Sequence, residues 1–349
     1  MTVVAGDLSF GLWYDFRNPE PWAVPFESLY RGALDQIADA EQLGFDSVWL
    51  TEHHFCEDGY TPSPLVIAAS IAERTSRLRI GTNLMLLPLH DPIRLAEDAA
   101  TLSLLSGGRF DLGVGMGYRQ LEFDTFGQSL RNRPSLLEEG VEIIRRAWSG
   151  APIDFAGRRF SYGDVTVRPT PTNVPRLLVG AMADVAIERV ARIGDGFLST
   201  QNAHQATFLD AVRRHRGDVD DAVICAGQWT IIADDPEREW AKIGDHALYQ
   251  MNEYVAWGAF GPQVPTFPDR DAVIAGGAYE VWDPDTAVAE ITALVKGTPQ
   301  IRDVHFWAQL PGEPLDSGSA RLELMATKVL PRVRAALAPP DPTNQETKP

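Results

Sequence analysis

Cysteine and long apolar runs are scarce in this chain. Cys56 and Cys225 are the two cysteines among its 349 residues, and they form no CxxC or metal-ligand spacing, which is typical of a protein in a reducing compartment. No segment approaches the roughly 18 consecutive apolar residues of a membrane span, and the N-terminus lacks the basic and apolar regions of a secretory signal. We therefore expect a cytoplasmic protein that is neither secreted nor inserted in a membrane.

Positive charge is also in short supply. The 31 basic residues are outnumbered by 48 acidic residues, which gives a formal net charge of −17, and they form no long basic run. A surface for nucleic acid or for an anionic membrane is therefore disfavoured. The hydrophobic content of 44% is enough for a large core.

Short apolar or β-branched runs alternate with helical patterns along most of the chain. In the first half, strands are expected at 8–14, 47–51, 78–86 and 109–114, and helices at 29–43, 65–75, 93–105 and 136–148. After an expected hairpin at 153–167, strands follow at 176–179, 196–200, 223–232 and 304–307, and helices at 185–193, 206–215, 237–255, 286–295 and 320–337. Eight βα units predict one (β/α)8 TIM barrel, an α/β fold that fills residues 1–338 as a single domain.

Two segments interrupt this alternation. Residues 257–282 are rich in Gly, Pro and aromatic residues, and we interpret them as an insertion near the C-terminal third that forms a substrate lid, with a plain surface excursion as the alternative. Residues 339–349 are Pro-rich and polar, and we expect a disordered tail there.

A carboxylate and two imidazoles follow the expected strand 47–51. Glu52, His53 and His54 stand where a barrel strand ends, which is the end at which barrel enzymes build their active sites. Adjacent strand residues point to opposite faces, so a metal site that uses both histidines is disfavoured and we expect no metal. A structural hydrogen-bonding cluster and a general acid–base role for one histidine both remain open.

Glycines and small residues mark two further strand ends. Gly113, Gly115 and Gly117 would face one side of a strand, where they make room either for a flat cofactor or for barrel packing. A dinucleotide fingerprint would need glycine where Tyr118 stands, so we reject a Rossmann interpretation. Between an expected strand and helix, residues 180–183 form either a phosphate-binding turn or an ordinary βα turn.

Taken together, several ordered motifs resemble the bacterial luciferase-like flavin monooxygenases. The resemblance covers roughly residues 8 to 230 and rests on LTEHHF at 50–55, LRIGTNLMLL at 78–87, PIRLAED at 92–98, GGRFDLGVGMG at 107–117, FDTFG at 123–127 and GDG at 194–196. It implies a barrel that binds FMN, delivered reduced by a separate flavin reductase. Oxygen would add at flavin C4a to give a peroxide, which inserts one oxygen atom into a hydrophobic small organic substrate.

The resemblance also assigns roles to residues of this chain. His53 aligns with the family's catalytic histidine, and Glu52 would orient that site. The cofactor-binding positions would be Asn83 and Leu84, joined in many relatives by a cis peptide bond, together with Gly115, Met116, Tyr118, Arg133, Gly180, Ala181, Met182 and Ala183. Relatives often carry arginine at the position of Met116 and hydroxyls at those of Met182 and Ala183, so the phosphate would depend on backbone N–H groups and Arg133.

Two other functions stay open at this point. A deazaflavin-dependent oxidoreductase of the same superfamily would transfer hydride and leave O₂ alone, and a non-catalytic flavin-binding subunit would lack turnover. Aromatic residues such as Trp13, Tyr60, Trp257 and Phe260 near the expected pocket favour a hydrophobic substrate. The resemblance further implies a homodimer formed through the helices near strands two and three.

Overall fold

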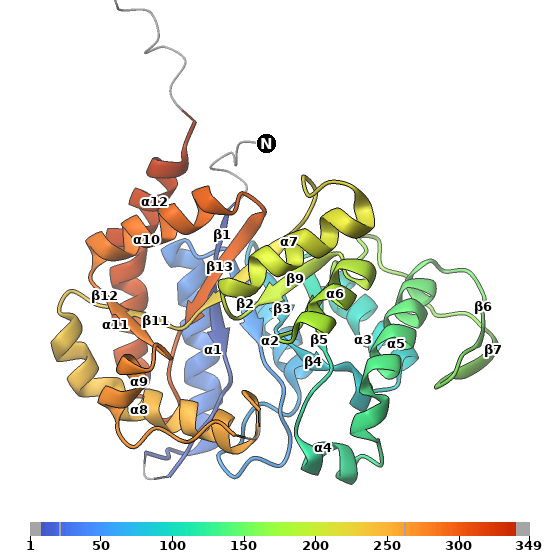
Figure 1. Cartoon of the computed structure of the whole chain (residues 1–349), viewed down its shortest axis with the longest axis horizontal. Coiled ribbons are helices and arrows are strands. Elements are labelled where there is room, and N and C mark those ends of the chain that lie inside the picture. Colours follow the sequence, from blue (N-terminus) through green and yellow to red (C-terminus); the bar gives the residue numbers. More distant parts are fainter. Residues whose placement is uncertain (1–7, 21, 262, 340–349) are drawn as a thin grey trace, which may run out of the picture.

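A closed barrel of parallel strands forms the centre of the computed structural model, which describes residues 8–20, 22–261 and 263–339 (Figure 1). Within these residues the eight barrel strands are β1 (Ser9–Tyr14), β2 (Ser47–Leu50), β3 (Arg79–Thr82), β5 (Phe110–Gly115), β8 (Leu177–Gly180), β9 (Gly196–Ser199), β10 (Ile224–Gln228) and β13 (Ile301–Trp307). They follow one another around the ring, and pairing of β3 with β5 closes it. The short strand β4 (Met85–Leu86) pairs with the end of β5. The predicted TIM barrel is confirmed.

Helices surround the barrel (Figure 1). They are α1 (Phe26–Leu43), α2 (Pro64–Arg74), α3 (Pro92–Leu105), α4 (Gln120–Thr125), α5 (Arg133–Trp148), α6 (Asp184–Ile193), α7 (Ala203–Arg216), α8 (Pro236–Ala256), α9 (Arg270–Ala275), α10 (Pro284–Gly297), α11 (Leu315–Leu324) and α12 (Leu330–Leu337). Short 3-10 turns lie at Leu87–Leu89 and Leu130–Asn132, and a π-helical segment, Met325–Val329, joins α11 to α12. The start of α3 shows how the sequence sets such boundaries: the Asp91 side chain accepts the N–H groups of Ile93 and Arg94, and Pro92 needs no hydrogen-bond partner for its nitrogen.

Side chains alternate between the two faces of each barrel strand. On β1, Phe10 and Leu12 pack in the main core between the strands and the surrounding helices, whereas Trp13 belongs to a second cluster with Trp49. A methyl group added at Gly81 would overlap the Trp49 ring, so the barrel interior admits that indole because glycine stands beside it. Trp13 and Trp49 thus form part of the buried cluster inside the barrel.

Register brings the functional segments to one rim. Tyr14 pairs with Leu50, and Leu50 pairs with Thr82, so the residues after these three strands leave the barrel at the same level. The second half of the barrel aligns likewise, since Gly180 pairs with Leu198. Parallel strands have all their carboxyl ends on one side, and the predicted motifs meet there.

Three details differ from the sequence prediction. The expected strand 78–86 is broken at the cis peptide bond between Asn83 and Leu84, the bond that the family resemblance implied. The expected strand 223–232 is broken at Trp229, because its second part, β11 (Thr230–Ile232), leaves the barrel to pair with β12 (Glu280–Trp282). Residues 257–282 are therefore less irregular than predicted, since they contain β12 and α9.

The peripheral predictions fare differently. The hairpin forms as β6 (Ile153–Ala156) and β7 (Ser161–Val165) and projects at the right of Figure 1. Residues 340–349, most of the predicted tail, lie outside the described residues. In the part of the chain that the structure describes, every helix is too short or too polar to cross a bilayer.

Candidate active site

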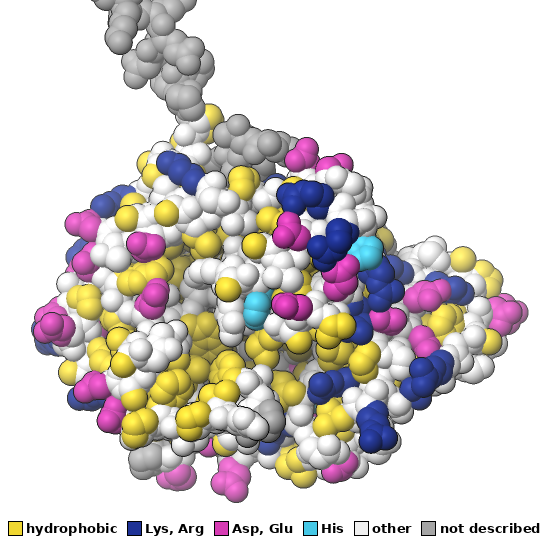
Figure 2. Space-filling view, viewed as in Figure 1, with side chains coloured by type: hydrophobic (Ala, Val, Ile, Leu, Met, Phe, Trp, Pro, Cys, Tyr) yellow, Lys and Arg dark blue, Asp and Glu magenta, His cyan; other side chains and the backbone are white. Residues whose placement is uncertain are grey.

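A pocket of about 700 Å³ lies at the carboxyl ends of the barrel strands. Of the residues predicted from the sequence, it is lined by Glu52, His53, Asn83, Leu84, Met116, Tyr118, Arg133, Gly180, Ala181, Met182 and Ala183. Gly115 is the one predicted residue that does not line it. The hollow on the face shown in Figure 2 is bordered by hydrophobic side chains, in keeping with the mostly apolar lining.

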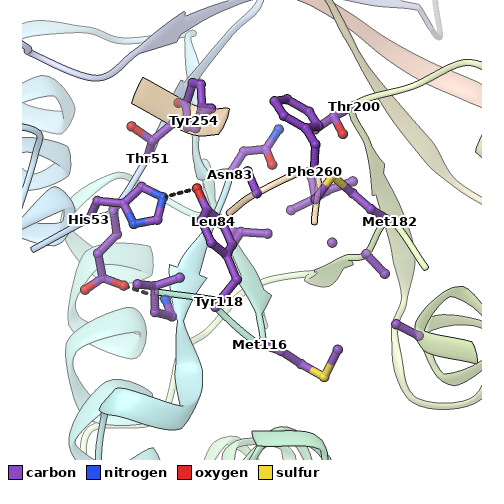
Figure 3. A pocket seen from close by; sticks show the side chains of 18 of the residues that line it. Thr51, His53, Asn83, Leu84, Met116, Tyr118, Met182, Thr200, Tyr254 and Phe260 are labelled. Carbon is purple, nitrogen blue, oxygen red and sulfur yellow. Dashed lines mark hydrogen bonds between the residues drawn. The ribbon is translucent and has the colours of Figure 1, made fainter. Parts of the chain in front are cut away.

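His53 stands in a hydrogen-bonded chain of three side chains. Its Nδ1 lies 2.8 Å from Oε1 of Glu122, and its Nε2 lies 3.0 Å from the Tyr118 hydroxyl. Figure 3 shows His53 and Tyr118 directed toward each other at the pocket wall. Glu122 is fully buried, and its Oε1 also accepts the backbone N–H of His54 at 2.9 Å.

Burial and hydrogen bonding determine the protonation of these three side chains. Burial lowers the pKa of His53, and the hydrogen bond that His53 donates to Glu122 opposes that shift only in part. Burial raises the pKa of Glu122, but its bonds to His53 and to the His54 N–H outweigh burial and leave that pKa below its ordinary value. Burial holds the pKa of Tyr118 well above its ordinary value. An ionised Glu122 therefore accepts from Nδ1–H of a neutral His53, whose Nε2 accepts from the Tyr118 O–H.

Glu122 is a site residue that the sequence reasoning missed. It lies on the short helix α4, 69 residues after His53, and it directly precedes the FDTFG motif that contributed to the family resemblance. The signal that the sequence offered was a carboxylate directly next to a motif of the family resemblance. Arg119 adds to the site, since its Nη1 lies 3.2 Å from Glu122 Oε1 and its guanidinium lies 4.5 Å from the Trp257 ring centre.

Glu52 contacts the other histidine. Its Oε1 lies 3.2 Å from Nε2 of His54 and 2.8 Å from Nε2 of His90, and its second oxygen accepts the Leu86 N–H. Burial raises the pKa of Glu52, but the charge of His90 and these hydrogen bonds outweigh it and lower that pKa to about 2. The contact with His53 is thus made by Glu122, whereas Glu52 binds the last residue of β4. The ligand-capable atoms of Glu52, His54 and His90 lie within 4.8 Å of one another.

The glycines on β5 and β8 make room for Leu84. A methyl group at Gly115 would approach the Leu84 side chain to 2.7 Å, and one at Gly180 would overlap it. Gly115 therefore acts on the pocket through Leu84, which does line it. The glycines at 113, 115 and 117 were expected to make room either for a flat cofactor or for barrel packing. Packing against Leu84 is what the structure shows at Gly115.

The opposite wall is built from backbone and a few polar groups. Residues 180–183 run from the end of β8 into α6, whose first N–H groups receive no capping side chain from Ala183. Arg133 lines the same pocket and donates to the Gly117 carbonyl at 3.1 Å. His204, which the sequence reasoning did not single out, lines it too, and its buried Nδ1 has no hydrogen-bond partner among the described residues.

Aromatic rings form the remaining wall. Trp13 and Trp307 stack with ring centres 4.6 Å apart, and Trp229 lies 5.5 Å from Trp307. The hydroxyls of Tyr60 and Tyr254 lie 2.9 Å apart beside them. The indole N–H of Trp307 is buried and finds no partner within the described chain, so it is available to an acceptor on a ligand.

Comparison with known proteins decides the family. The model of the luciferase-like monooxygenases matches residues 11–299. The chain belongs to the luciferase-like monooxygenase family.

Several members of this family resemble the chain over different lengths. The 4-hydroxyprotoasukamycin monooxygenase of Streptomyces nodosus subsp. asukaensis is 26% identical, and the alignment covers 95% of this chain and 93% of that protein. The F420-dependent glucose-6-phosphate dehydrogenase of Amycolatopsis mediterranei is 30% identical over 52% of this chain and 56% of its own length. The crystal structure of monooxygenase RslO1 from Streptomyces bottropensis is 25% identical, with a TM-score of 0.78 and coverage of 93% of this chain and 99% of that chain. The chain spans about half the length of the first curated relatives it matches.

Proposed function

We propose that this luciferase-like protein is a two-component flavin monooxygenase. It takes reduced FMN from a separate flavin reductase and uses O₂ to oxygenate a hydrophobic small molecule. The observation that carries the proposal is the Glu122–His53–Tyr118 chain at the wall of an apolar pocket. The two monooxygenases compared above support it, because their similarity extends over nearly the whole chain.

The pocket fits a flavin in three respects. Residues 180–183 offer a backbone cradle at the start of α6, and Arg133 adds a positive charge for a phosphate. The unpaired N–H of Trp307 and the unpaired Nδ1 of His204 are available to a polar ligand, and an isoalloxazine ring presents carbonyl and ring-nitrogen acceptors. Tryptophan rings supply flat apolar surface for the rest of such a molecule.

When bound, reduced FMN supplies the electrons that activate O₂. The protein's own groups hold protons and exclude water. His53 is neutral, and its Nδ1–H is bound to Glu122, so its Nε2 is an acceptor. This nitrogen accepts the hydrogen bond of the Tyr118 hydroxyl and so holds the hydroxyl proton at the pocket wall. Trp229, Phe260 and Tyr254 limit the access of water to the same space.

A second function has one specific observation in its favour. The half-length match to an F420-dependent dehydrogenase supports a deazaflavin-dependent oxidoreductase, in which the same pocket would bind the deazaflavin and transfer hydride. A neutral histidine at the pocket wall would serve as a general base there as well. The two functions differ in the cofactor that binds and in whether O₂ is consumed.

We also propose a homodimer that uses α2 and α3. These adjacent helices expose large apolar side chains, with Val66 at 70%, Leu105 at 62% and Leu104 at 41% exposure. Such side chains are favoured at interfaces between copies of a chain. Sedimentation of the purified protein would give the dimer mass if this face is buried.

The test is a pair of anaerobic titrations, one with reduced FMN and one with reduced deazaflavin F420, followed by rapid mixing with O₂. We expect tight binding of reduced FMN and a return of oxidised-flavin absorbance that is slower than in free solution. Binding of the deazaflavin alone, without oxygen uptake, would contradict it and support the hydride-transfer function. A matched control is Arg133→Met, which should weaken FMN but leave riboflavin, which lacks the phosphate, unaffected.

A further inference from the structure

Behind Asn83 the barrel interior holds a buried Asp–His pair. Inward positions of a parallel barrel are usually filled by bulky branched apolar side chains. Strand β13 instead places Asp303 and His305 inside, with side chains that are 5% and 0% exposed. Burying a carboxylate and an imidazole costs free energy unless both are hydrogen-bonded, so their partners indicate what they do.

Asp303 is surrounded by donors. Its Oδ1 lies 3.0 Å from the indole nitrogen of Trp49 and 2.8 Å from Nδ1 of His305, and its Oδ2 accepts from the Ser47 hydroxyl. A carboxylate can only accept, so Nδ1 of His305 carries the proton of this hydrogen bond. The other ring nitrogen, Nε2 of His305, is the acceptor of its own contact, because the group that lies against it is a donor, the NH₂ of Asn83.

That acceptor faces the Asn83 carboxamide. Nδ2 of Asn83 lies 3.0 Å from Nε2 of His305, which fixes the amide with its NH₂ group toward the imidazole. The backbone of Asn83 is held too, because its N–H bonds to the Leu50 carbonyl at 2.6 Å and its carbonyl accepts from the Trp13 indole at 3.2 Å. Asn83 lines the pocket, and its Oδ1 accepts no hydrogen bond from the described residues.

We propose that Asp303 and His305 are positioning residues that hold Asn83 Oδ1 as a fixed acceptor for the flavin. This inference rests on the proposed function, in which the pocket binds FMN. A reduced isoalloxazine carries an N–H where the oxidised ring has a nitrogen without hydrogen. If the Asn83 carboxamide cannot rotate, its oxygen always faces the ring and accepts from that N–H, which favours the reduced form. Without His305, the amide can present either NH₂ or oxygen, and that preference is lost.

The experiment is the ratio of two dissociation constants, for oxidised and for reduced FMN, in His305→Phe, Asn83→Leu and the double variant. Loss of one hydrogen bond to the reduced ring is expected to lower the ratio about tenfold in each single variant. Since His305 acts through Asn83, the double variant should show no further change. The same effect lowers the two-electron reduction potential of bound FMN by about 30 mV. Leu178→Ala, which shortens a fully buried side chain inside the barrel on β8, separated from β13 by β9 and β10, is the control and should leave the ratio unchanged.

Three outcomes separate the possible failures. If the wild-type protein binds neither form of FMN, the proposed function itself fails. If it prefers reduced FMN but His305→Phe weakens both forms equally, or if the two substitutions add, His305 is only a packing residue and the inference is overturned. ¹⁵N spectra of histidine-labelled wild-type protein give an answer even if His305→Phe does not fold. The resonance that shifts in Asn83→Leu should belong to an imidazole protonated at Nδ1, and protonation at Nε2 would overturn the inference.

Discussion

His53 and His54 are consecutive residues that serve two different clusters. Both bond to a buried glutamate, but His53 pairs with Glu122 and presents its second nitrogen to Tyr118 at the pocket, whereas His54 pairs with Glu52 beside His90. Adjacent residues at a strand end point to opposite sides, which separates the two clusters. A buried His–Glu pair therefore does not by itself distinguish the two histidines. What distinguishes His53, and what led us to propose it as the catalytic histidine, is the contact of its second ring nitrogen with a residue that lines the pocket.

Replacement of His53 should produce the largest effect. His53→Ala removes the acceptor for the Tyr118 proton, and general acid–base groups of this kind contribute about 100- to 10,000-fold to a rate. Turnover of an accepted hydrophobic substrate, followed as oxygen-dependent product formation, should fall by that factor. The matched control is His54→Ala, which should leave turnover within about threefold, and equal losses in the two variants would remove the distinction drawn here.

The Glu52 cluster should instead control stability. The pKa of Glu52 is about 2, below its ordinary value of 4.5, so its stabilising contribution is complete above pH 4.5 and is lost as the pH falls toward 2. Glu52→Gln should therefore cost on the order of 3 kcal/mol at pH 7 and flatten the loss of stability between pH 4.5 and 2. Urea unfolding at pH 7 and at pH 3 measures both effects. A variant that unfolds like the wild type at both pH values would show that this cluster is not structural.

Glu122→Gln tests the other carboxylate. The neutral amide no longer fixes the His53 proton on Nδ1, so turnover should drop about 10- to 100-fold with little change in FMN affinity. Glu52→Gln, compared at a temperature where both variants are folded, serves as its control for rate. A larger rate loss in Glu52→Gln than in Glu122→Gln would reverse the assignment of the two clusters.

The acid limb of the rate profile should show the smallest effect. Burial lowers the pKa of His53, so the histidine is neutral at pH 7 and the rate should fall only below pH 6.5, the ordinary histidine value. Glu122 raises the pKa of His53, and Glu122→Gln should therefore move the acid limb to still lower pH. Measurement of kcat/KM from pH 5 to 8 in both proteins checks the direction. A shift toward higher pH in the variant would contradict the pairing.

Much of the fold could be predicted because local pattern determines it. Alternation of apolar strands with amphipathic helices gave the eight βα units, and the shared carboxyl rim of parallel strands placed His53, Asn83 and residues 180–183 together. The two breaks, at Asn83–Leu84 and at Trp229, could not be predicted from periodicity, since residues typical of strands stand on both sides of each break.

The site residues that were not predicted from the sequence were missed for a different reason. Glu122 and His305 contact the site across 69 and 222 positions of the sequence, so no local spacing reports them. His305 also lies among the inward residues of β13, where a sequence pattern predicts only apolar packing. Glu52, by contrast, was placed correctly at the pocket rim, but its side-chain direction depends on His90, which comes from a later loop.

The role of His53 can be tested by rapid mixing of O₂ with the FMNH₂-loaded wild-type protein, His53→Ala and His54→Ala. Oxidised-flavin absorbance should return slowly in the wild type and in His54→Ala. It should return at least about tenfold faster in His53→Ala, because the Tyr118 O–H loses the acceptor that orients it at the pocket wall. Equal rates in all three proteins would contradict the assignment of His53 to the flavin pocket.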